Sequence, residues 1–346
     1  KIISAIKANT SKSSQIICLM NGDVAFKGHQ DEYFHAYTFF EDLRDKVRKD
    51  SNIDTIFVPG NHDCDFTKQS PQVREALIQK VYDSTALGLE SGYIETVMLQ
   101  DNFYDFEKNF SEQWENIKVI HTTPICKQVH FYIKEYDNKY INLFLFNTSW
   151  MSQINEQPGK MFMPTDYIDS LEYDSKAILN ISILHHPTNW LDPDNKRSFD
   201  NILNKISDLV MTGHEHVNET LTLKKTSQST LFLEGGVLQE NWEEGKSEFN
   251  LLELDLENLF MFIKQFSWDA QKKMYVPLKE AEKIDLNDFR YQKVKFNGSG
   301  EIRINEGIQK KLLSLDFPIS HKIKGPLSLN DIYVLPDFND KFSEKK

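Results

Sequence analysis

The sequence predicts an α/β fold in which polar motifs follow buried strands. Short apolar runs occur at 16–20, 56–58, 181–184 and 209–211. Runs of this length, bounded by Gly, Pro or Asn, are typical of buried strands. The polar motifs that follow them are Asn21-Gly22-Asp23, Gly60-Asn61-His62-Asp63, His185-His186-Pro187 and Gly213-His214-Glu215-His216. Because sites in open α/β sheets lie at the carboxyl ends of strands, we expect these groups to meet at one edge.

A predicted helix joins the first two of these strands. From about Asp31 to Lys49, apolar residues recur at three- and four-residue steps, as Tyr33, Tyr37, Phe40, Leu43 and Val47. That spacing predicts one buried face. A crossover helix of this length joins parallel strands, so Asp23 and Asn61 are expected to project from neighbouring strand ends.

Residues 66–116 predict a mostly helical insertion. A helix begins near Pro71, and a second helical stretch covers 93–110. Because the insertion follows Gly60-Asn61-His62-Asp63 directly, we expect it to overhang the site; a helical layer that packs only on the scaffold is the alternative. Strands are predicted again at 117–120, 129–134 and 141–146, and strands alternate with turns over 230–276.

Composition and charge limit the partners of the chain. Hydrophobic residues make up 40% and charged residues 27%, which is ordinary for a soluble globular protein. No apolar stretch approaches the ~20 residues of a membrane helix, so no membrane partner is expected. Three cysteines favour a reducing cytoplasm over a disulfide framework. A net charge of −12 argues against broad nucleic-acid binding by this segment alone.

In this order, the motifs G-D, G-N-H-D, H-x-P and G-H-x-H resemble those of the calcineurin-like metallophosphoesterase superfamily, over roughly residues 1–265. The resemblance implies a four-layer αββα sandwich of two mixed sheets flanked by helices. The family's first block, D-x-H, is absent, since none of the ten histidines follows an Asp by two positions. Residues 1–6 resemble the helix that comes after that block. We therefore expect the first strand to be missing, through truncation rather than true loss.

The resemblance also implies two divalent metal ions, which could be Mn, Fe, Zn or Ni. Asp23 is expected to bridge them, because a carboxylate has two oxygens and can span a two-metal site. By the resemblance, Asn61, His185 and His214 bind the second ion. His216 goes to the first ion.

The catalytic residues implied by the resemblance are His62 and Asp63. His62 resembles the histidine that meets the phosphate and protonates the leaving oxygen, and an imidazole pKa near 6.5 suits that task. Asp63 either orients His62 or caps the next helix. His186 is expected to point away from the ligands, as a packed or hydrogen-bonded neighbour. The predicted function is hydrolysis of a phosphodiester by a metal-activated hydroxide, with a phosphate ester as substrate.

Two other functions stay open. One is a DNA or RNA nuclease of the same superfamily, which the acidic composition disfavours unless a downstream module supplies a binding surface. The other is a degenerate, non-catalytic domain that senses a metal or ligand. Without D-x-H, the first ion keeps only Asp23 and His216. We therefore expect this segment alone to bind one metal firmly and to hydrolyse poorly.

The predicted organisation is a metallophosphoesterase domain at 1–278, followed by a carboxyl-terminal extension or connector at 279–346. The second part contains scattered apolar residues, several prolines and one strand-like run at 327–334. It resembles connectors that join an amino-terminal effector domain to a downstream NTPase or repeat module in large bacterial proteins. A tail that packs back on the domain is the alternative.

Overall fold

A computed structural model of the protein describes residues 1–10, 15–48, 52–84, 89–134, 136–215, 220–225, 228–238, 247–288, 320–321 and 325–326. The chain forms two compact units, Lys1–Phe296 and Asn297–Lys346. The fold and the candidate site below belong to the first unit. Within the second unit, the described strands β14 (Ser320–His321) and β15 (Gly325–Pro326) pair antiparallel.

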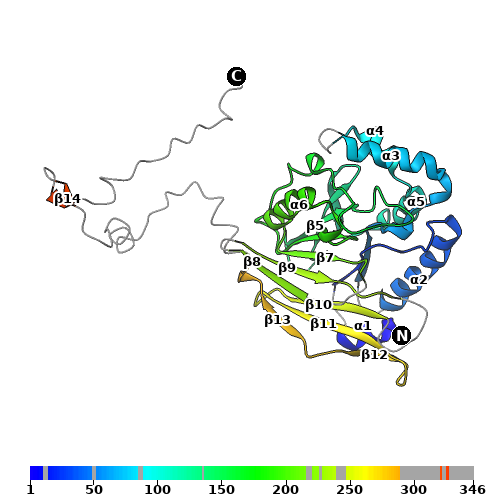
Figure 1. The fold of residues 1–346 in the computed structure, drawn as a ribbon. Helices are drawn as coiled ribbons and strands as arrows, with labels where there is room; N and C mark the ends of the chain where they lie inside the picture. Colours follow the sequence, from blue (N-terminus) through cyan, green and yellow to red (C-terminus); the bar gives the residue numbers. More distant parts are fainter. Residues whose placement is uncertain are drawn as a thin grey trace. The chain divides into compact units, whose positions relative to one another are not determined.

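A seven-stranded mixed sheet forms one central layer (Figure 1). Its strands, in spatial order, are β3 (Ile117–Thr122), β4 (Cys126–Tyr132), β5 (Tyr140–Phe146), β6 (Asn180–Leu184), β7 (Leu209–Thr212), β9 (Gln228–Glu234) and β8 (Thr220–Lys225). The four strands β5, β6, β7 and β9 run parallel, while β3, β4 and β8 pair antiparallel with their neighbours. The parallel strands bring the ends of β6 and β7 to the same edge of the sheet.

The second central layer contains two groups of strands. One is the parallel pair β1 (Gln15–Met20) and β2 (Asn52–Phe57). The other is antiparallel and contains β10 (Glu248–Asp255), β11 (Phe260–Asp269), β12 (Met274–Pro277) and β13 (Glu282–Asp285). No described strand joins the two groups by hydrogen bonds, so the second sheet that the sequence predicts is divided in this part of the chain.

Helices cover both outer faces, which completes four layers. On the outer face of the seven-stranded sheet, α3 (Pro71–Asp83), α4 (Ser91–Val97) and α6 (Pro193–Ile206) pack on Phe144 and Phe146. On the far side, α2 (Gln30–Arg48) and α5 (Asp101–Ser111) pack on β1 and β2, and α1 (Ile2–Asn9) packs on β11 and β12 (Figure 1). Apolar residues of both strand layers form the core between them. The predicted α/β fold, with sheets flanked by helices, is confirmed.

The predicted insertion is helical, but its second stretch is divided. Helix α3 begins as expected, because Ser70 accepts a hydrogen bond from the Val73 N–H and Pro71 occupies the first helical position. The stretch predicted over 93–110 forms two helices, α4 and α5, separated by residues 98–100. Helix α5 lines a cavity of about 340 Å³ that also touches Pro59, so the insertion reaches the flank of the candidate site.

The domain boundary that the sequence analysis places at residue 278 stays a prediction. Strand β13 lies beyond it and pairs with β11, so the sheet itself continues past that point. The strand-like run predicted at 327–334 lies outside the described residues. Among the helices that the structure describes, none is long and apolar enough to cross a membrane.

Candidate metal centre

The loop after β1 turns sharply and places Asp23 against the end of β6. Gly22 has a φ of +103°, and a Cβ on it would lie 2.2 Å from Nδ1 of His185. Only glycine fits this close approach in this backbone conformation. Asp23 follows with a φ of +56°, a left-handed conformation that Asp tolerates better than most residues.

The turn after β2 brings Asn61 to the same place. Gly60 lies so close to Asp23 that an added Cβ would meet its Oδ1 at 2.1 Å. Residues Asn61–Asp63 then form one turn of 3-10 helix. The His62 N–H donates to Asp23 Oδ1 over 3.0 Å, which leaves Oδ2 of this carboxylate for other contacts.

Four predicted ligands converge, and we call Asp23, Asn61, His185 and His214 the ligand cluster. Nε2 of His185 lies 2.9 Å from Asn61 Oδ1, 3.1 Å from His214 Nδ1 and 3.4 Å from Asp23 Oδ2. Nδ1 of His214 is 3.1 Å from Asn61 Oδ1. Four segments of the chain therefore bring oxygen and nitrogen atoms to one point. The fifth predicted ligand, His216, lies outside the described residues.

The atoms that meet in the ligand cluster are mainly acceptors. Nδ1 of His185 lies 2.6 Å from the Asn21 carbonyl oxygen, which can only accept, so this nitrogen is the ring donor. In the neutral ring Nε2 then carries a lone pair, and it faces the oxygens of Asn61 and Asp23. A cation between these atoms would accept all of their lone pairs at once, and these separations match the ~3.0 Å between neighbouring ligands of an octahedral ion.

His214 is held neutral and in an uncommon backbone conformation. Burial, with the neighbouring His186 and His185, lowers the pKa of His214 to about 3, so its ring is uncharged at pH 7 and free to bind a metal. Its φ is +70°, which costs free energy for a residue other than glycine. Strained conformations of this kind cluster at functional sites.

His186 is a buried, hydrogen-bonded neighbour, as expected, but its ring does not point away from the ligand cluster. His185, His186 and His214 each have a potential ligand atom within 4.8 Å of the others. However, Nε2 of His186 is 3.1 Å from Oε2 of Glu156, and both side chains are buried. The ring also lies 4.4 Å from that of His214, so the His186–Glu156 pair packs directly behind a predicted ligand.

Asp63 ties the two ligand loops together. Its fully buried carboxylate accepts hydrogen bonds from the backbone N–H groups of Gly60 and Ala25, at 2.8 and 2.9 Å, and from the Tyr33 hydroxyl at 2.9 Å. Burial raises the pKa of Asp63 to about 6, and the two N–H donors oppose that rise. Asp63 is thus placed to fix backbone positions, and the catalytic role predicted for it stays a prediction.

The ring of His62 is held by Phe26. His62 Nδ1 donates to the Phe26 carbonyl oxygen over 2.9 Å, which leaves Nε2 as the free ring nitrogen. The Phe26 ring stacks on the His62 ring, with 5.3 Å between centroids and 18° between planes. The described hydrogen bond that orients this ring thus comes from Phe26, 36 residues away in the sequence.

Trp190, which no sequence motif singled out, forms one wall of the ligand cluster. The Trp190 ring lies 4.2 Å from the His214 ring, at 85° to it. Its Nε1–H donates to Glu215 over 2.8 Å, and Asn189 donates to the same carboxylate over 2.9 Å. Glu215, between the two histidines of its motif, thereby holds Trp190 beside the cluster.

A model of the calcineurin-like phosphoesterase family matches residues 2–218, which is more than half of the chain. The chain belongs to this family. The matched region contains the whole ligand cluster and His62. The metallophosphoesterase resemblance carried by the four motifs is thus confirmed, whereas the role of each residue is not tested by the match. No curated protein matches the chain.

Solved structures of other proteins share a distant likeness with this family member. A double mutant and a single mutant of Vps29 from Entamoeba histolytica are 11% and 12% identical and each match 82% of this chain and 87% and 89% of their own, with TM-scores of 0.28. Vacuolar Protein Sorting 29 from Cryptosporidium parvum is 11% identical over 72% of this chain and 76% of its own, with a TM-score of 0.25. Because these TM-scores are low, we draw no conclusion from them.

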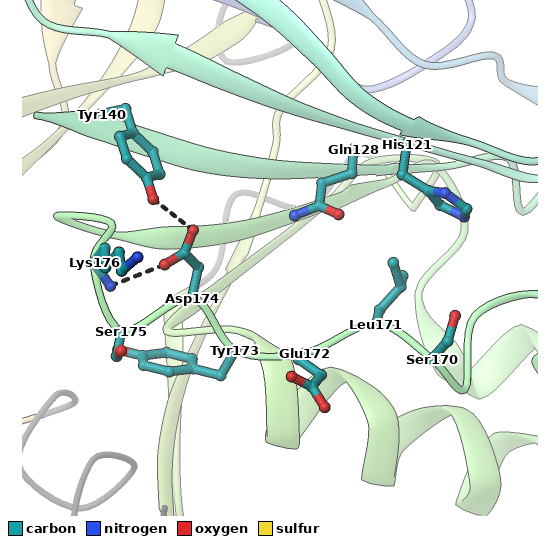
Figure 2. A pocket seen from close by; sticks show the side chains of 10 residues that line it. All are labelled: His121, Gln128, Tyr140, Ser170, Leu171, Glu172, Tyr173, Asp174, Ser175 and Lys176. Atoms are coloured by element: carbon teal, nitrogen blue, oxygen red, sulfur yellow. Dashed lines mark hydrogen bonds between the residues drawn. The ribbon is translucent and has the colours of Figure 1, made fainter. Parts of the chain in front are cut away.

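A separate cavity of about 520 Å³ lies beside the outer face of β3, β4 and β5 (Figure 2). The loop 170–176 covers it, and it contains no member of the ligand cluster. At one end, the Tyr140 hydroxyl donates to Asp174 Oδ2 over 2.7 Å (Figure 2). Tyr140 is the first residue of β5, so this end of the cavity lies at the end of the strand opposite to the candidate metal centre.

Proposed function

We propose that this chain is a metal-dependent hydrolase that cleaves a phosphodiester. The observation that carries the proposal is the ligand cluster, in which oxygens and imidazole nitrogens from four separate segments face each other at 2.9 to 3.4 Å. Membership of the calcineurin-like phosphoesterase family supports the same reaction class.

The residues present fit a divalent ion with mixed oxygen and nitrogen ligands. One carboxylate, one amide oxygen and two imidazoles suit Mn, Fe, Zn or Ni, and no thiolate takes part among the described residues. Asp23 has the second oxygen that a bridge to a further ion needs, with His216 as the proposed partner. When bound, such ions lower the pKa of water and neutralise charge on phosphoryl oxygens.

The chain's own residues would position the substrate and move a proton. Nδ1 of His62 is engaged with the Phe26 carbonyl, so only Nε2 is free to give a proton to the leaving oxygen. The backbone N–H of His62 donates to Asp23, which keeps this residue next to the ligand cluster. Asp63 supports both loops from below, because it accepts N–H groups from each.

Metal content and hydrolysis test the proposal together. We expect the protein, loaded with Mn²⁺, to hydrolyse bis(p-nitrophenyl) phosphate, and His62→Ala to lower kcat by about 100-fold or more while metal binding is retained. His35→Ala is the matched control, because His35 is an exposed histidine on α2 outside the cluster. Its kcat should stay unchanged.

Metal content and the range of substrates hydrolysed together separate the competing functions. Elemental analysis should find one tightly held ion per chain, or two if the first-ion ligands suffice. If the protein binds metal but hydrolyses neither bis(p-nitrophenyl) phosphate (the dye substrate) nor a cyclic nucleotide nor single-stranded DNA, a metal- or ligand-sensing domain is favoured. Activity confined to single-stranded DNA would favour the nuclease. A protein that binds no divalent ion would end the proposal.

A further inference from the structure

An exposed aromatic ring stands beside the proposed catalytic histidine. Phe26 leaves 68% of its surface exposed although its neighbour Ala25 is buried. One face of the ring stacks on His62, at 5.3 Å and 18°. Exposed apolar residues are common on this surface, but among the described residues Phe26 is the one whose ring stacks on the proposed catalytic histidine, and an exposed ring at that place offers a face to a bound ligand.

The backbone holds this ring in place from several sides. Asp63 accepts hydrogen bonds from Val24 and Ala25, immediately before Phe26. After it, the Gly28 carbonyl accepts from the Asn102 side chain over 2.8 Å. Gly28 also packs so closely that an added Cβ would lie 2.7 Å from the Asp63 carbonyl oxygen. Phe26 is therefore presented by a loop that is fixed on both sides of it.

We infer that Phe26 is a stacking platform for the nucleobase of a nucleotide-type substrate. The inference rests on the proposed function, because it assumes that a phosphoryl group lies between His62 and the ligand cluster. The ester group would then extend past His62 towards Phe26, and a nucleotide separates its phosphate from its base by one ribose. A flat base stacks on a phenyl face whatever its hydrogen-bonding edge, and such stacking contributes strongly to binding.

Two ligands that differ only in the base test this subsite. AMP and ribose 5-phosphate are titrated into the full chain loaded with Mn²⁺, with binding measured by isothermal titration calorimetry. We expect AMP to bind about tenfold more tightly than ribose 5-phosphate. Phe26→Ala should reduce that ratio to within about twofold, while Phe26→Trp should keep it, because tryptophan also offers a face for stacking.

Phe34 supplies the matched control. It is 70% exposed, on α2, and its described ring contact is to His35 rather than to His62. Phe34→Ala should leave the affinity ratio unchanged. The ratio also guards against misfolding, since a damaged site would lose ribose 5-phosphate as well as AMP.

The possible failures are distinguishable. Equal binding of the two ligands by the wild type, or a ratio kept by Phe26→Ala, overturns the stacking platform; if bis(p-nitrophenyl) phosphate is still hydrolysed, the proposed function stands. If neither ligand binds and the dye is not hydrolysed, the phosphate site itself is absent and both proposals fall. If Phe34→Ala lowers the affinity ratio as much as Phe26→Ala does, Phe26 is not the residue on which the base stacks.

Discussion

Polar side chains cluster at both ends of β5 and β6, and the two clusters are bonded in different ways. At the amino ends, Gln128, Asn142, Asn180, Asp174 and Tyr140 form what we call the amide network. Gln128 donates to Asn142 over 3.0 Å, and Asn142 donates to Asn180 over 2.9 Å. Each amide gives its N–H to the next oxygen, so donors and acceptors alternate. At the carboxyl ends, the ligand cluster directs acceptors at acceptors.

The difference shows how two sets of similar residues serve different purposes. Buried amides and carboxylates that alternate donors and acceptors satisfy one another, and they stabilise the fold without a ligand. Buried acceptors that converge cannot satisfy one another, and a bound cation removes the conflict. The comparison predicts that substitutions at the two ends have opposite consequences for metal binding and for stability.

The largest contrast should be in metal affinity. His185→Ala removes a nitrogen from the ligand cluster, and the Mn²⁺ dissociation constant should rise by more than about 100-fold in a calorimetric titration. His130→Ala is the control, because this histidine stacks on Tyr140 beside the amide network. Its affinity for Mn²⁺ should stay within about twofold. Equal losses in the two variants would contradict the distinction.

Next in size should be a loss of stability at the amide network. Asn180 is fully buried and bonds Asn142 and Asp174, so Asn180→Ala leaves several polar groups without partners. Its free energy of unfolding should fall by about 2–3 kcal/mol in urea denaturation, to the same extent with and without Mn²⁺. Asn109→Ala on the exposed side of α5 should change it by less than about 0.5 kcal/mol. A Mn²⁺-dependent loss for Asn180→Ala would link the network to the metal.

A backbone contact at the ligand cluster should also be costly. Gly60→Ala places a Cβ 2.1 Å from Asp23 Oδ1 and 2.4 Å from its backbone nitrogen, so the two ligand loops must separate. We expect a loss of about 1–3 kcal/mol in stability together with weaker Mn²⁺ binding. In contrast, Gly92→Ala in α4 meets nothing within 4 Å and should stabilise the protein by about 0.5–1 kcal/mol. Thermal unfolding of both variants, with Mn²⁺ and with a chelator, measures the difference.

The smallest and most specific effect should be a gain in the stability of the metal-free protein. Asp23→Asn supplies an amide donor where His185 and Asn61 present acceptors, and Asn tolerates the left-handed backbone at this position. The metal-free protein should gain about 0.5–1 kcal/mol in stability and lose Mn²⁺ binding. The same exchange at the other end, Asp174→Asn, leaves one side-chain oxygen where the Tyr140 hydroxyl and the Lys176 N–H each need an acceptor, and it should destabilise. Destabilisation by both substitutions in chelator would count against converging acceptors.

Local sequence patterns predicted most of the fold. Alternation and apolar runs placed the strands that precede the polar motifs, and helix α2 lies within one residue of its predicted range. Between β4 and β5, Asp137 and Asn138 form a turn, with Asn138 at a φ of +58°, a conformation that Asn tolerates. The division between α4 and α5 was missed because the apolar spacing runs on across residues 98–100, where contacts made by Gln100 with Asn147 and Ser149 decide the path.

The candidate site could be predicted as far as its motifs extend. The convergence of Asp23, Asn61, His185 and His214 follows from strands that end at one edge, and the burial of His186 follows from alternation. Hydrogen bonds to backbone carbonyls could not be predicted, because every residue has a carbonyl group. The Asn21 carbonyl accepts from His185, and the Phe26 carbonyl accepts from His62. Glu156 lies in a loop without a motif, 30 residues from His186. Trp190 follows the His185-His186-Pro187 motif by three residues, but its ring contact with His214 joins distant parts of the chain and leaves no local signal.

The hydrogen bonds to Asp63 have a consequence for protein engineering. One carboxylate clamps the segment 22–28 to the turn 60–64, since it accepts N–H groups from Val24 and Ala25 on one side and from Gly60 on the other. The two segments therefore form one structural unit, although α2 and β2 lie between them in the sequence. Grafting this centre onto another scaffold requires that both pieces, with the aspartate that fastens them, be transplanted together.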